Sequence, residues 1–394
     1  MRRRNFALLW IGQSISLLGD KAHQIALPVL VFQLTDSPLQ VGLIFAAIGL
    51  PWLLLGSVAG ALVDRWDRRR TMATADLLRA GLVALVPVAA RVDISVVYLL
   101  AFLISALSVF FIPARLASIP DIVESDELLA ANSLFQISDA FVDVIGLLVA
   151  AILVLALGVV TPFYLDAISF LISGAFILAM TFSPSPREWE PLSPRRLAEE
   201  LVEGFRFVAG NAYLAANTFL FTLGPLASGA TTAMTAVYAI QVLRAGAPGF
   251  ALMEASMSLG FLAGGLAIGR FAARYRKGRI ILAGFALFGI TLLGIGLTDR
   301  LAVALILVGV NGVANMLFYI PSITLVQEIT PADLRGRAFG LRSALIQGAF
   351  LVSVSVGGAI TEVAGVESIF VLAGGLVLIV GLLGWLAPSL READ

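Results

Sequence analysis

The sequence of 394 residues contains no cysteine and a single histidine, His23. Without cysteine there is no disulfide framework, no thiol nucleophile and no cysteine-based metal or iron–sulfur site. One histidine excludes the multi-histidine cage of a zinc hydrolase. The Gly-x-x-x-x-Gly-Lys-Ser/Thr loop that cradles ATP phosphates is also missing. We therefore expect no enzyme activity of these kinds, no cofactor and no resident metal.

Charge is scarce as well, since only 13% of the residues are charged, against about 25% in soluble domains. The 26 basic and 26 acidic residues give a formal net charge of zero, which excludes a basic nucleic-acid-binding protein. Hydrophobic residues make up 59% of the chain. A globule of this size cannot bury that many, so the main solvent of this chain is lipid.

The apolar runs predict twelve membrane-spanning helices, at about 20 residues per crossing. The first run is not a cleaved signal peptide, because Gln13, Asp20 and Lys21 interrupt it and no small-residue cleavage site follows. The predicted spans are Phe6 to Leu34, Leu39 to Val63, Thr71 to Ala90, Ile94 to Ala117, Leu128 to Gly158, Pro162 to Phe182, Ala212 to Val242, Phe250 to Ala272, Ile280 to Leu297, Leu301 to Val326, Gly340 to Ile360 and Ser368 to Leu386.

The positions of lysine and arginine predict the orientation in the membrane. Nearly all of them fall on one side of this twelve-span assignment, and only Arg91, Arg244 and Arg300 fall on the other. Cytoplasmic loops carry the excess of basic residues. We therefore expect both termini to be cytoplasmic, in a multi-pass protein of a prokaryotic plasma (inner) membrane.

One long polar stretch, Ser183 to Asn211, divides the spans into six and six. Its second half predicts an amphipathic helix at the cytoplasmic interface, with an apolar face formed by Leu197, Leu201, Phe205 and Val208. The sequence thus predicts an N-terminal six-helix bundle over residues 1–184, a cytoplasmic linker over 185–210 and a C-terminal six-helix bundle over 211–394.

The two halves resemble each other at an offset of about 208 residues. Phe111-Ile-Pro113 returns as Tyr319-Ile-Pro321, and Gly60-x-x-x-x-Arg65 returns as Gly269-x-x-x-x-Arg274. Two parallel six-helix repeats joined by a cytoplasmic linker are typical of a rocker-type secondary transporter, with its site between the halves. The alternative is twelve hydrophobic helices with an accidental likeness.

The sharpest local motif is Gly60-Ala-Leu-Val-Asp64-Arg65-Trp-Asp67-Arg68-Arg-Arg. Glycine lets two helices approach, Asp64 can accept hydrogen bonds from a helix N-terminus or an arginine, and the basic tail can anchor in the anionic leaflet. These properties suit a latch on the cytoplasmic gate. Alternatively, the run serves only to fix the topology.

This motif resembles the signature loop of the major facilitator superfamily, with Asp67 where that family usually has glycine. Further segments resemble its macrolide-efflux and enterobactin-exporter branch, and the resemblance covers essentially the whole chain. It implies an all-α membrane fold, with twelve transmembrane helices in two six-helix bundles related by pseudo-two-fold symmetry. The segments are Ile11 to Asp20, Thr71 to Arg79, Pro113 to Arg115, Ala130 to Ser133, Tyr164 to Phe170 and Thr330 to Arg337.

Ionisable residues at membrane depth are costly and indicate function. A polar stripe on the first predicted helix consists of Gln13, Ser16, Asp20 and Gln24, and a second stripe on the fifth consists of Gln136, Asp139 and Asp143. Three carboxylates against Lys21 favour protonation of at least one of them. We expect Lys21 to pair with Asp139 or Asp143. The three acids then couple proton uptake to export or bind a cationic cargo; otherwise they form a static lock with Lys21.

His23 lies one turn beyond Asp20 and can relay protons or sense pH, or it can be a structural partner. A divalent metal site built from Asp20, His23 and an aspartate of the fifth helix is chemically possible, although nothing in the sequence favours it.

The C-terminal half carries mainly neutral polar and aromatic groups that can line an apolar cargo pocket, or simply pack between helices. Glu254 is the one acid well inside this half and is a candidate second protonation site or outward-gate contact. The candidate pocket residues are Phe221, Thr231, Thr235, Asn311, Asn315, Phe318 and Tyr319.

Several charged residues near the predicted cytoplasmic ends are candidates for the cytoplasmic gate. We expect Arg115 and Glu328 to form ion pairs there with Asp64, Asp76 or Arg79. The full set of gate residues is Gly60, Asp64, Arg65, Arg68, Asp76, Arg79, Arg115 and Glu328.

Together these features predict a monomeric secondary transporter that exports a small amphiphilic compound, of drug, macrolide or siderophore type, by proton antiport and alternating access. Its expected partners are small-molecule cargo, protons and the lipid bilayer, and no nucleic acid. A lipid or lysolipid flippase and a metal or siderophore exporter of the same fold are alternatives. A non-transporting membrane receptor or scaffold is an alternative of another class, but it would not need the buried acids.

Overall fold

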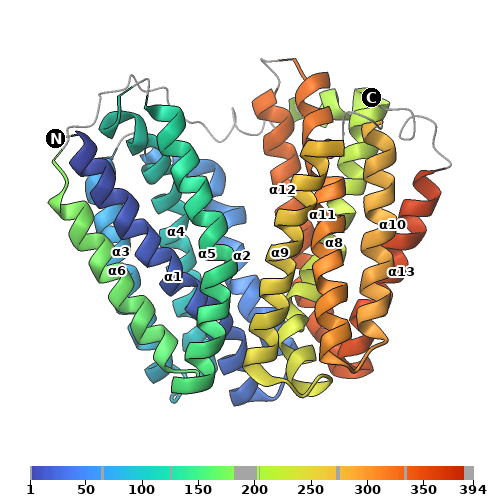
Figure 1. Ribbon diagram of the computed structural model, residues 1–394, viewed down its shortest axis with the longest axis horizontal. Helices are drawn as coiled ribbons and strands as arrows, with labels where there is room; N and C mark the ends of the chain where they lie inside the picture. Colours follow the sequence, from blue (N-terminus) through green and yellow to red (C-terminus); the bar gives the residue numbers. More distant parts are fainter. Residues whose placement is uncertain are drawn as a thin grey trace. The chain divides into compact units, whose positions relative to one another are not determined.

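The computed structural model describes residues 2–63, 66–124, 127–181, 202–203, 205–271, 276–331 and 335–385 (Figure 1). Long helices occupy almost all of these residues, and no strand occurs among them. The helices are α1 (Arg2–Thr35), α2 (Pro38–Val63), α3 (Arg68–Ala89), α4 (Ile94–Ile122), α5 (Leu128–Leu157), α6 (Thr161–Ala179), α8 (Ala212–Gln241), α9 (Gly246–Phe271), α10 (Lys277–Gly296), α11 (Leu301–Ile329), α12 (Arg335–Ala364) and α13 (Val366–Gly384).

Each predicted span corresponds to one of these helices. The largest differences are at the end of α4, which continues from Ala117 to Ile122, and at the start of α12, which begins at Arg335 rather than Gly340. Within the described residues, eleven helices are long and apolar enough to cross a membrane. The exception is α8, which carries Asn217, Thr218 and Thr222 among its apolar residues. The chain is a multi-pass membrane protein.

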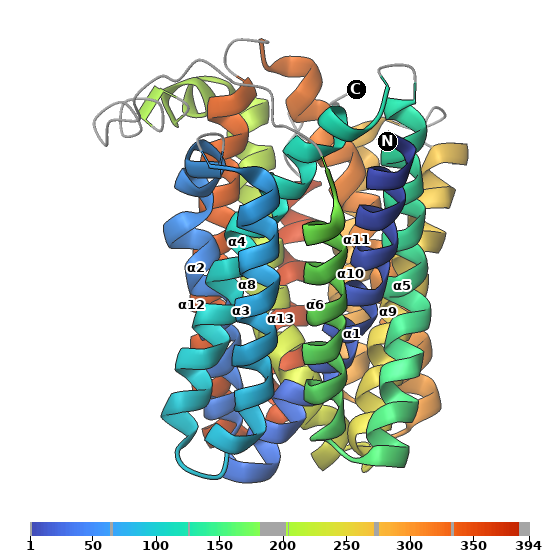
Figure 2. The same cartoon turned by 90° about the vertical axis from the view of Figure 1, so that its left-hand side faces the viewer.

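The chain forms two compact units, one of residues 1–36 and 44–191 and the other of residues 37–43 and 192–394. In the first, α1 packs against α5 and α6, and α3 packs against α4 and α6 (Figure 2). In the second, α8 packs against α12 and α13, and α10 packs against α11 and α13. The same scheme of neighbours therefore occurs in both units, as expected for two copies of one six-helix arrangement.

Asp67 explains one departure from the signature loop. Its side chain accepts a hydrogen bond from the backbone N–H of Arg70 at 2.9 Å and so caps the N-terminus of α3. Asparagine, aspartate and glycine are all good residues at this position, so Asp67 can replace the usual glycine. Asp93 caps α4 in the same way, and hydrogen bonds from the backbone N–H and the hydroxyl of Ser95 lower the pKa of this exposed carboxyl.

The predicted amphipathic linker helix is described only in part. Residues 205–210 are helical, with Phe205 exposed and Val208 packed against Leu214 and Val326. Leu197 and Leu201 lie outside the described residues.

Helices α9 and α11 approach closely because glycines line their contact. A Cβ atom added at Gly260 would lie 2.1 Å from the carbonyl oxygen of Gly309, and one at Gly264 would lie 2.8 Å from Cβ of Met316. Small residues allow such close packing in membranes. These glycines fix the distance between the two helices.

We expect Gly260→Leu to destabilise the protein by about 1–3 kcal/mol, because overpacking forces the backbones apart. Thermal unfolding of the purified protein measures the effect. Gly265→Leu is the matched control, since the same helix offers open space around a Cβ at that position. Equal melting temperatures for the two variants would contradict the assignment of this contact.

Candidate functional site

A cavity of about 560 Å³ lies within the first unit, among α1, α2, α3 and α4. Gln13, Ser16, Asp20 and Gln24, the predicted polar stripe of α1, all line it. Phe45, Trp52 and Phe111 add aromatic surface. The volume lies in the usual range for small-molecule pockets. Gln136, in contrast, is exposed on α5 and does not line this cavity.

The two acids of α5 are each held by a cation. Lys21 Nζ lies 2.6 Å from Asp143 Oδ1, one of the two partners expected for this lysine. Arg115 Nη2 lies 3.9 Å from Asp139 Oδ2. Arg115 was expected to pair with Asp64, Asp76 or Arg79. The structure instead directs it from α4 into the cavity toward Asp139, and Asp76 and Arg79 pair with each other. Asp64 lies outside the described residues. The predicted excess of negative charge around Lys21 is smaller than expected for the same reason.

Gly146 makes room for the lysine that reaches Asp143. A Cβ atom at Gly146 would lie 3.1 Å from Lys21 Cγ and 3.3 Å from Lys21 Cβ. The stem of Lys21 thus runs across α5 at its glycine, one turn beyond Asp143.

Asp76 and Arg79 form an ion pair within α3, with both side chains almost completely buried. The guanidinium carbon of Arg79 lies 4.4 Å from the ring centre of Phe111 and 4.3 Å from that of Phe170. Cation–π contacts of this kind are stronger when the cation is removed from water, as it is here. These two residues, predicted to pair with Arg115 or Glu328 at the gate, pair with each other instead, and Arg79 lines the cavity.

His23 hydrogen-bonds to an acid on α6. Its Nδ1 lies 3.0 Å from Asp166 Oδ2, and Asp166 is fully buried. Ser169 Oγ donates to the Asp166 backbone oxygen at 2.7 Å. Gly19 packs directly on this carboxylate, since a Cβ there would lie 2.6 Å from Asp166 Oδ1. Asp166 was not among the candidate residues, although an acid inside an apolar helix was a sufficient signal.

Asp20 differs from the other acids in the described helices of this unit. Asp76, Asp121, Asp139, Asp143 and Asp166 each lie within salt-bridge distance of an arginine, lysine or histidine. Within the described residues, Asp20 has no such partner. It interacts electrostatically, over longer distances, with Arg79, His23, Asp76 and Asp166. Asp20 lines the cavity.

A metal site at Asp20 does not fit this geometry. His23 is bound to Asp166, and the acids of α5 are bound to Lys21 and Arg115. Across the part of the chain that the structure describes, no three acidic or histidine side chains gather as metal ligands would.

The signature loop is partly described. Arg68 Nη1 lies 2.7 Å from Asp121 Oδ2 and donates to the Ala117 carbonyl oxygen at 2.9 Å, which joins the start of α3 to the end of α4. Gly60 lies in α2, whereas Asp64 and Arg65 lie outside the described residues. Glu328, predicted at the gate, pairs with Lys277 at 2.9 Å.

In the second unit, the predicted pocket residues make contacts within the helix bundle. Thr231 and Thr235 donate to backbone carbonyl oxygens of α8, and Asn311 donates to Thr291 Oγ1 at 2.7 Å. Phe221 and Phe318 belong to one aromatic cluster with Tyr319. Asn315 and Glu254 are half-buried on α11 and α9.

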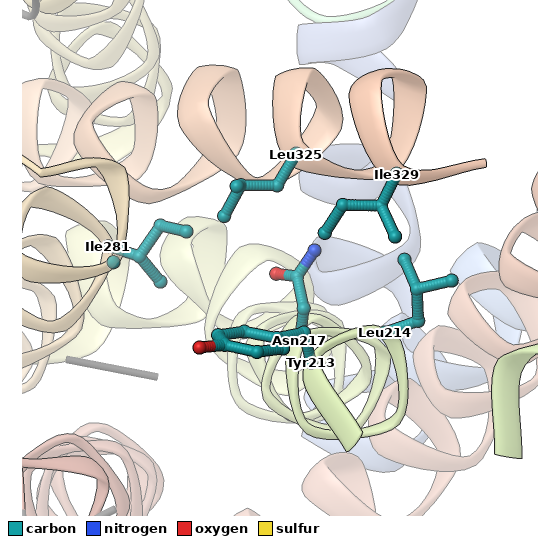
Figure 3. A pocket seen from close by; sticks show the side chains of 7 residues that line it. Tyr213, Leu214, Asn217, Ile281, Leu325 and Ile329 are labelled. Atoms are coloured by element: carbon teal, nitrogen blue, oxygen red, sulfur yellow. The ribbon is translucent and has the colours of Figure 1, made fainter. Parts of the chain in front are cut away.

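A small pocket between α8, α10 and α11 surrounds the amide of Asn217 (Figure 3). Its volume is about 10 Å³, which is at most enough for one water molecule. It is not a cargo site.

Arg342 of α12 is a buried cation that was not predicted. It is 3% exposed, and its guanidinium carbon lies 3.6 Å from the ring centre of Phe221. The signal was an arginine inside the predicted span that begins at Gly340. In the structure it lies seven residues after the start of α12.

A family model described as "Transmembrane secretion effector" matches residues 1–394. An uncharacterised MFS-type transporter of Bacillus subtilis, YfiS, is 26% identical, and the alignment covers 99% of this chain and 95% of that protein. Macrolide efflux protein A of Streptococcus pyogenes is 22% identical, with coverage of 99% and 97%. The multidrug efflux pump Tap of Mycobacterium tuberculosis is 25% identical, with coverage of 98% and 94%.

Solved structures with the same fold include the nucleoside transporter NupG, with a TM-score of 0.79 at 14% identity and coverage of 97% of this chain and 98% of that one. A bacterial homologue of the iron transporter ferroportin gives a TM-score of 0.75 at 16% identity, with coverage of 97% and 98%. The predicted fold is thereby confirmed, and the chain is a transporter rather than an enzyme. It belongs to the major facilitator superfamily, in the family of transmembrane secretion effectors.

Proposed function

We propose that this transporter exports a small amphiphilic compound in exchange for protons, with Asp20 as the group for which proton and cargo compete. The observation that carries the proposal is the contrast between Asp20 and the five other acids in the described helices of the first unit. Those acids have ion-pair partners, whereas Asp20 lines the cavity and has none among the residues that the structure describes. A carboxyl of this kind can gain and lose a proton without breaking a salt bridge.

The chemistry follows from charge balance in a site of low dielectric. In this setting, ionised Asp20 can stabilise a cationic group of the cargo. When Asp20 takes up a proton, its charge disappears and the cargo loses its main electrostatic partner. Binding of proton and cargo then becomes mutually exclusive, which is the requirement for antiport.

Two further features support this assignment. Phe45, Trp52 and Phe111 offer apolar and π surface for the body of an amphiphile. His23 lies one turn from Asp20 and shares a hydrogen bond with buried Asp166, so a proton can pass between the cavity and α6. We propose that His23 and Asp166 form the proton relay. In this proposal the ion pair of Lys21 with Asp143 stays intact and does not exchange protons.

The relatives named as macrolide and multidrug efflux proteins support a drug-like or macrolide cargo. We further propose that the protein acts as a monomer in the plasma membrane, with both termini in the cytoplasm and alternating access between the two units. The basic residues of the predicted cytoplasmic loops support this orientation.

Liposomes that contain the purified protein and an internal pH dye test the proposal. Erythromycin, as a macrolide probe, is expected to drive proton movement in the opposite direction, and an imposed pH gradient is expected to drive erythromycin uptake or release. Empty liposomes are the control. Erythromycin transport without proton flux would contradict antiport, and gradient-independent movement of labelled lysolipid would favour a flippase.

A further inference from the structure

Arg342 in the second unit is a buried cation. Among the residues that the structure describes, no carboxylate lies within salt-bridge distance of it. The buried arginines Arg68 and Arg79 and the half-buried Arg115 of the first unit are different, because each pairs with an acid. Burial of a charge at membrane depth without a partner costs free energy. Packing contacts alone do not offset that cost for Arg342.

Neutral groups hold the guanidinium in place. Nη2 of Arg342 donates to Ser322 Oγ at 2.6 Å, and Ser322 Oγ donates onward to Asn217 Oδ1 at 2.8 Å. Asn217 Nδ2 donates back to the Ser322 carbonyl oxygen at 3.1 Å. The ring of Phe221 lies against the guanidinium carbon. These contacts from α8 and α11 orient Arg342 but do not neutralise it.

One end of the guanidinium has unused donors. Nη1 of Arg342 is buried and finds no hydrogen-bond acceptor in the described part of the chain. A buried donor without an acceptor is destabilising, and a planar guanidinium matches the two oxygens of a carboxylate or phosphate. An anionic oxygen would complete the hydrogen bonding at this end of the guanidinium.

The surroundings indicate the rest of the ligand. Phe221, which supports the guanidinium, contacts Phe318 and Tyr319 at ring-centre distances of 6.1 and 5.5 Å. Tyr319 is 41% exposed, so the aromatic cluster reaches the surface beside the buried cation. A ligand with an apolar body and an acidic head satisfies both parts.

We infer that Arg342 binds the carboxylate or phosphate head of an anionic amphiphile, at a site formed with Phe221, Ser322 and Tyr319. The amphiphile is either a free compound or a membrane phospholipid, because both present the same oxygens. This site is independent of Asp20, and its test does not require proton coupling.

Titration calorimetry of the full chain in maltoside micelles tests the inference with dodecyl phosphate, dodecanoate and, as the cationic counterpart, dodecyltrimethylammonium. We expect the two anions to bind more tightly than the cation. Arg342→Gln is expected to lower anion affinity at least about tenfold, since a charge-assisted hydrogen bond is lost. Arg279→Gln removes the same charge from an exposed position on α10 and should behave as the wild type.

The phosphorus content of the purified protein separates the two sources. Phospholipid phosphate that the wild type retains, that Arg342→Gln lacks and that dodecyl phosphate displaces would identify a lipid site. Binding of dodecanoate without such retained phosphate would identify a free amphiphile. If the wild type shows no preference for the anions over dodecyltrimethylammonium, the inference is overturned, even if Arg342→Gln fails to fold.

Discussion

Replacement of Asp20 by asparagine is expected to abolish cargo-driven proton flux while the protein remains folded. Asparagine keeps the size and polarity of the side chain but cannot ionise. Because the carboxyl has no ion-pair partner in the described residues, its loss leaves no buried cation uncompensated. The flux should fall at least about a hundredfold, as for loss of an essential proton-transfer group. The internal pH dye in liposomes measures it.

Two controls make this result specific to the cavity. Asp20→Glu keeps an ionisable group and should retain part of the flux. Asp93→Asn makes the same chemical change at the exposed cap of α4 and should leave flux unchanged. Wild-type flux in the Asp20→Asn variant would show that another acid carries the proton, with the Asp166 and His23 pair as the next candidate.

Replacement of Arg79 by methionine is expected to be strongly destabilising. The guanidinium neutralises fully buried Asp76 and lies between the rings of Phe111 and Phe170. Removal of one member of a buried ion pair costs about 3–5 kcal/mol, because the remaining charge has no counter-ion. We expect a clear fall in the thermal unfolding temperature of the purified protein in detergent.

The double variant Asp76→Asn with Arg79→Met tests the electrostatic origin of that loss. It removes both charges together, so it should be more stable than Arg79→Met alone. Arg70→Met, at an exposed arginine of the same helix, is the matched control and should have little effect. A double variant that is no more stable than Arg79→Met would show that packing, and not charge, dominates.

The helices and the polar stripe of α1 were predictable because they depend on residues that are near one another in the chain. The spacing of Gln13, Ser16 and Asp20 is sufficient to place them on one face. The run lengths are likewise sufficient to predict each span. Among the described helices, α8 is the one that falls short of the apolar pattern. Its threonine hydroxyls donate to backbone oxygens of the same helix, so they are not left without hydrogen bonds in an apolar setting.

The partners of the charged residues were less predictable, because they come from helices distant in sequence. Arg115 and Asp139 meet only because α4 and α5 pack together, and His23 meets Asp166 across 143 residues. Arg342 was missed for a related reason. It was placed at a helix end, where a basic residue is unremarkable, whereas the contact with Phe221 buries it.

The ion pairs of the first unit have a mechanical consequence. Lys21 with Asp143 joins α1 to α5, Arg115 with Asp139 joins α5 to α4, Arg68 with Asp121 joins α4 to α3, and His23 with Asp166 joins α1 to α6. Because α6 also packs against α3, these ion pairs and that packing contact together connect five helices in a closed ring. Such a ring resists shear between its members, so during a transport cycle the first unit should turn as one stiff piece, with strain borne by its loops.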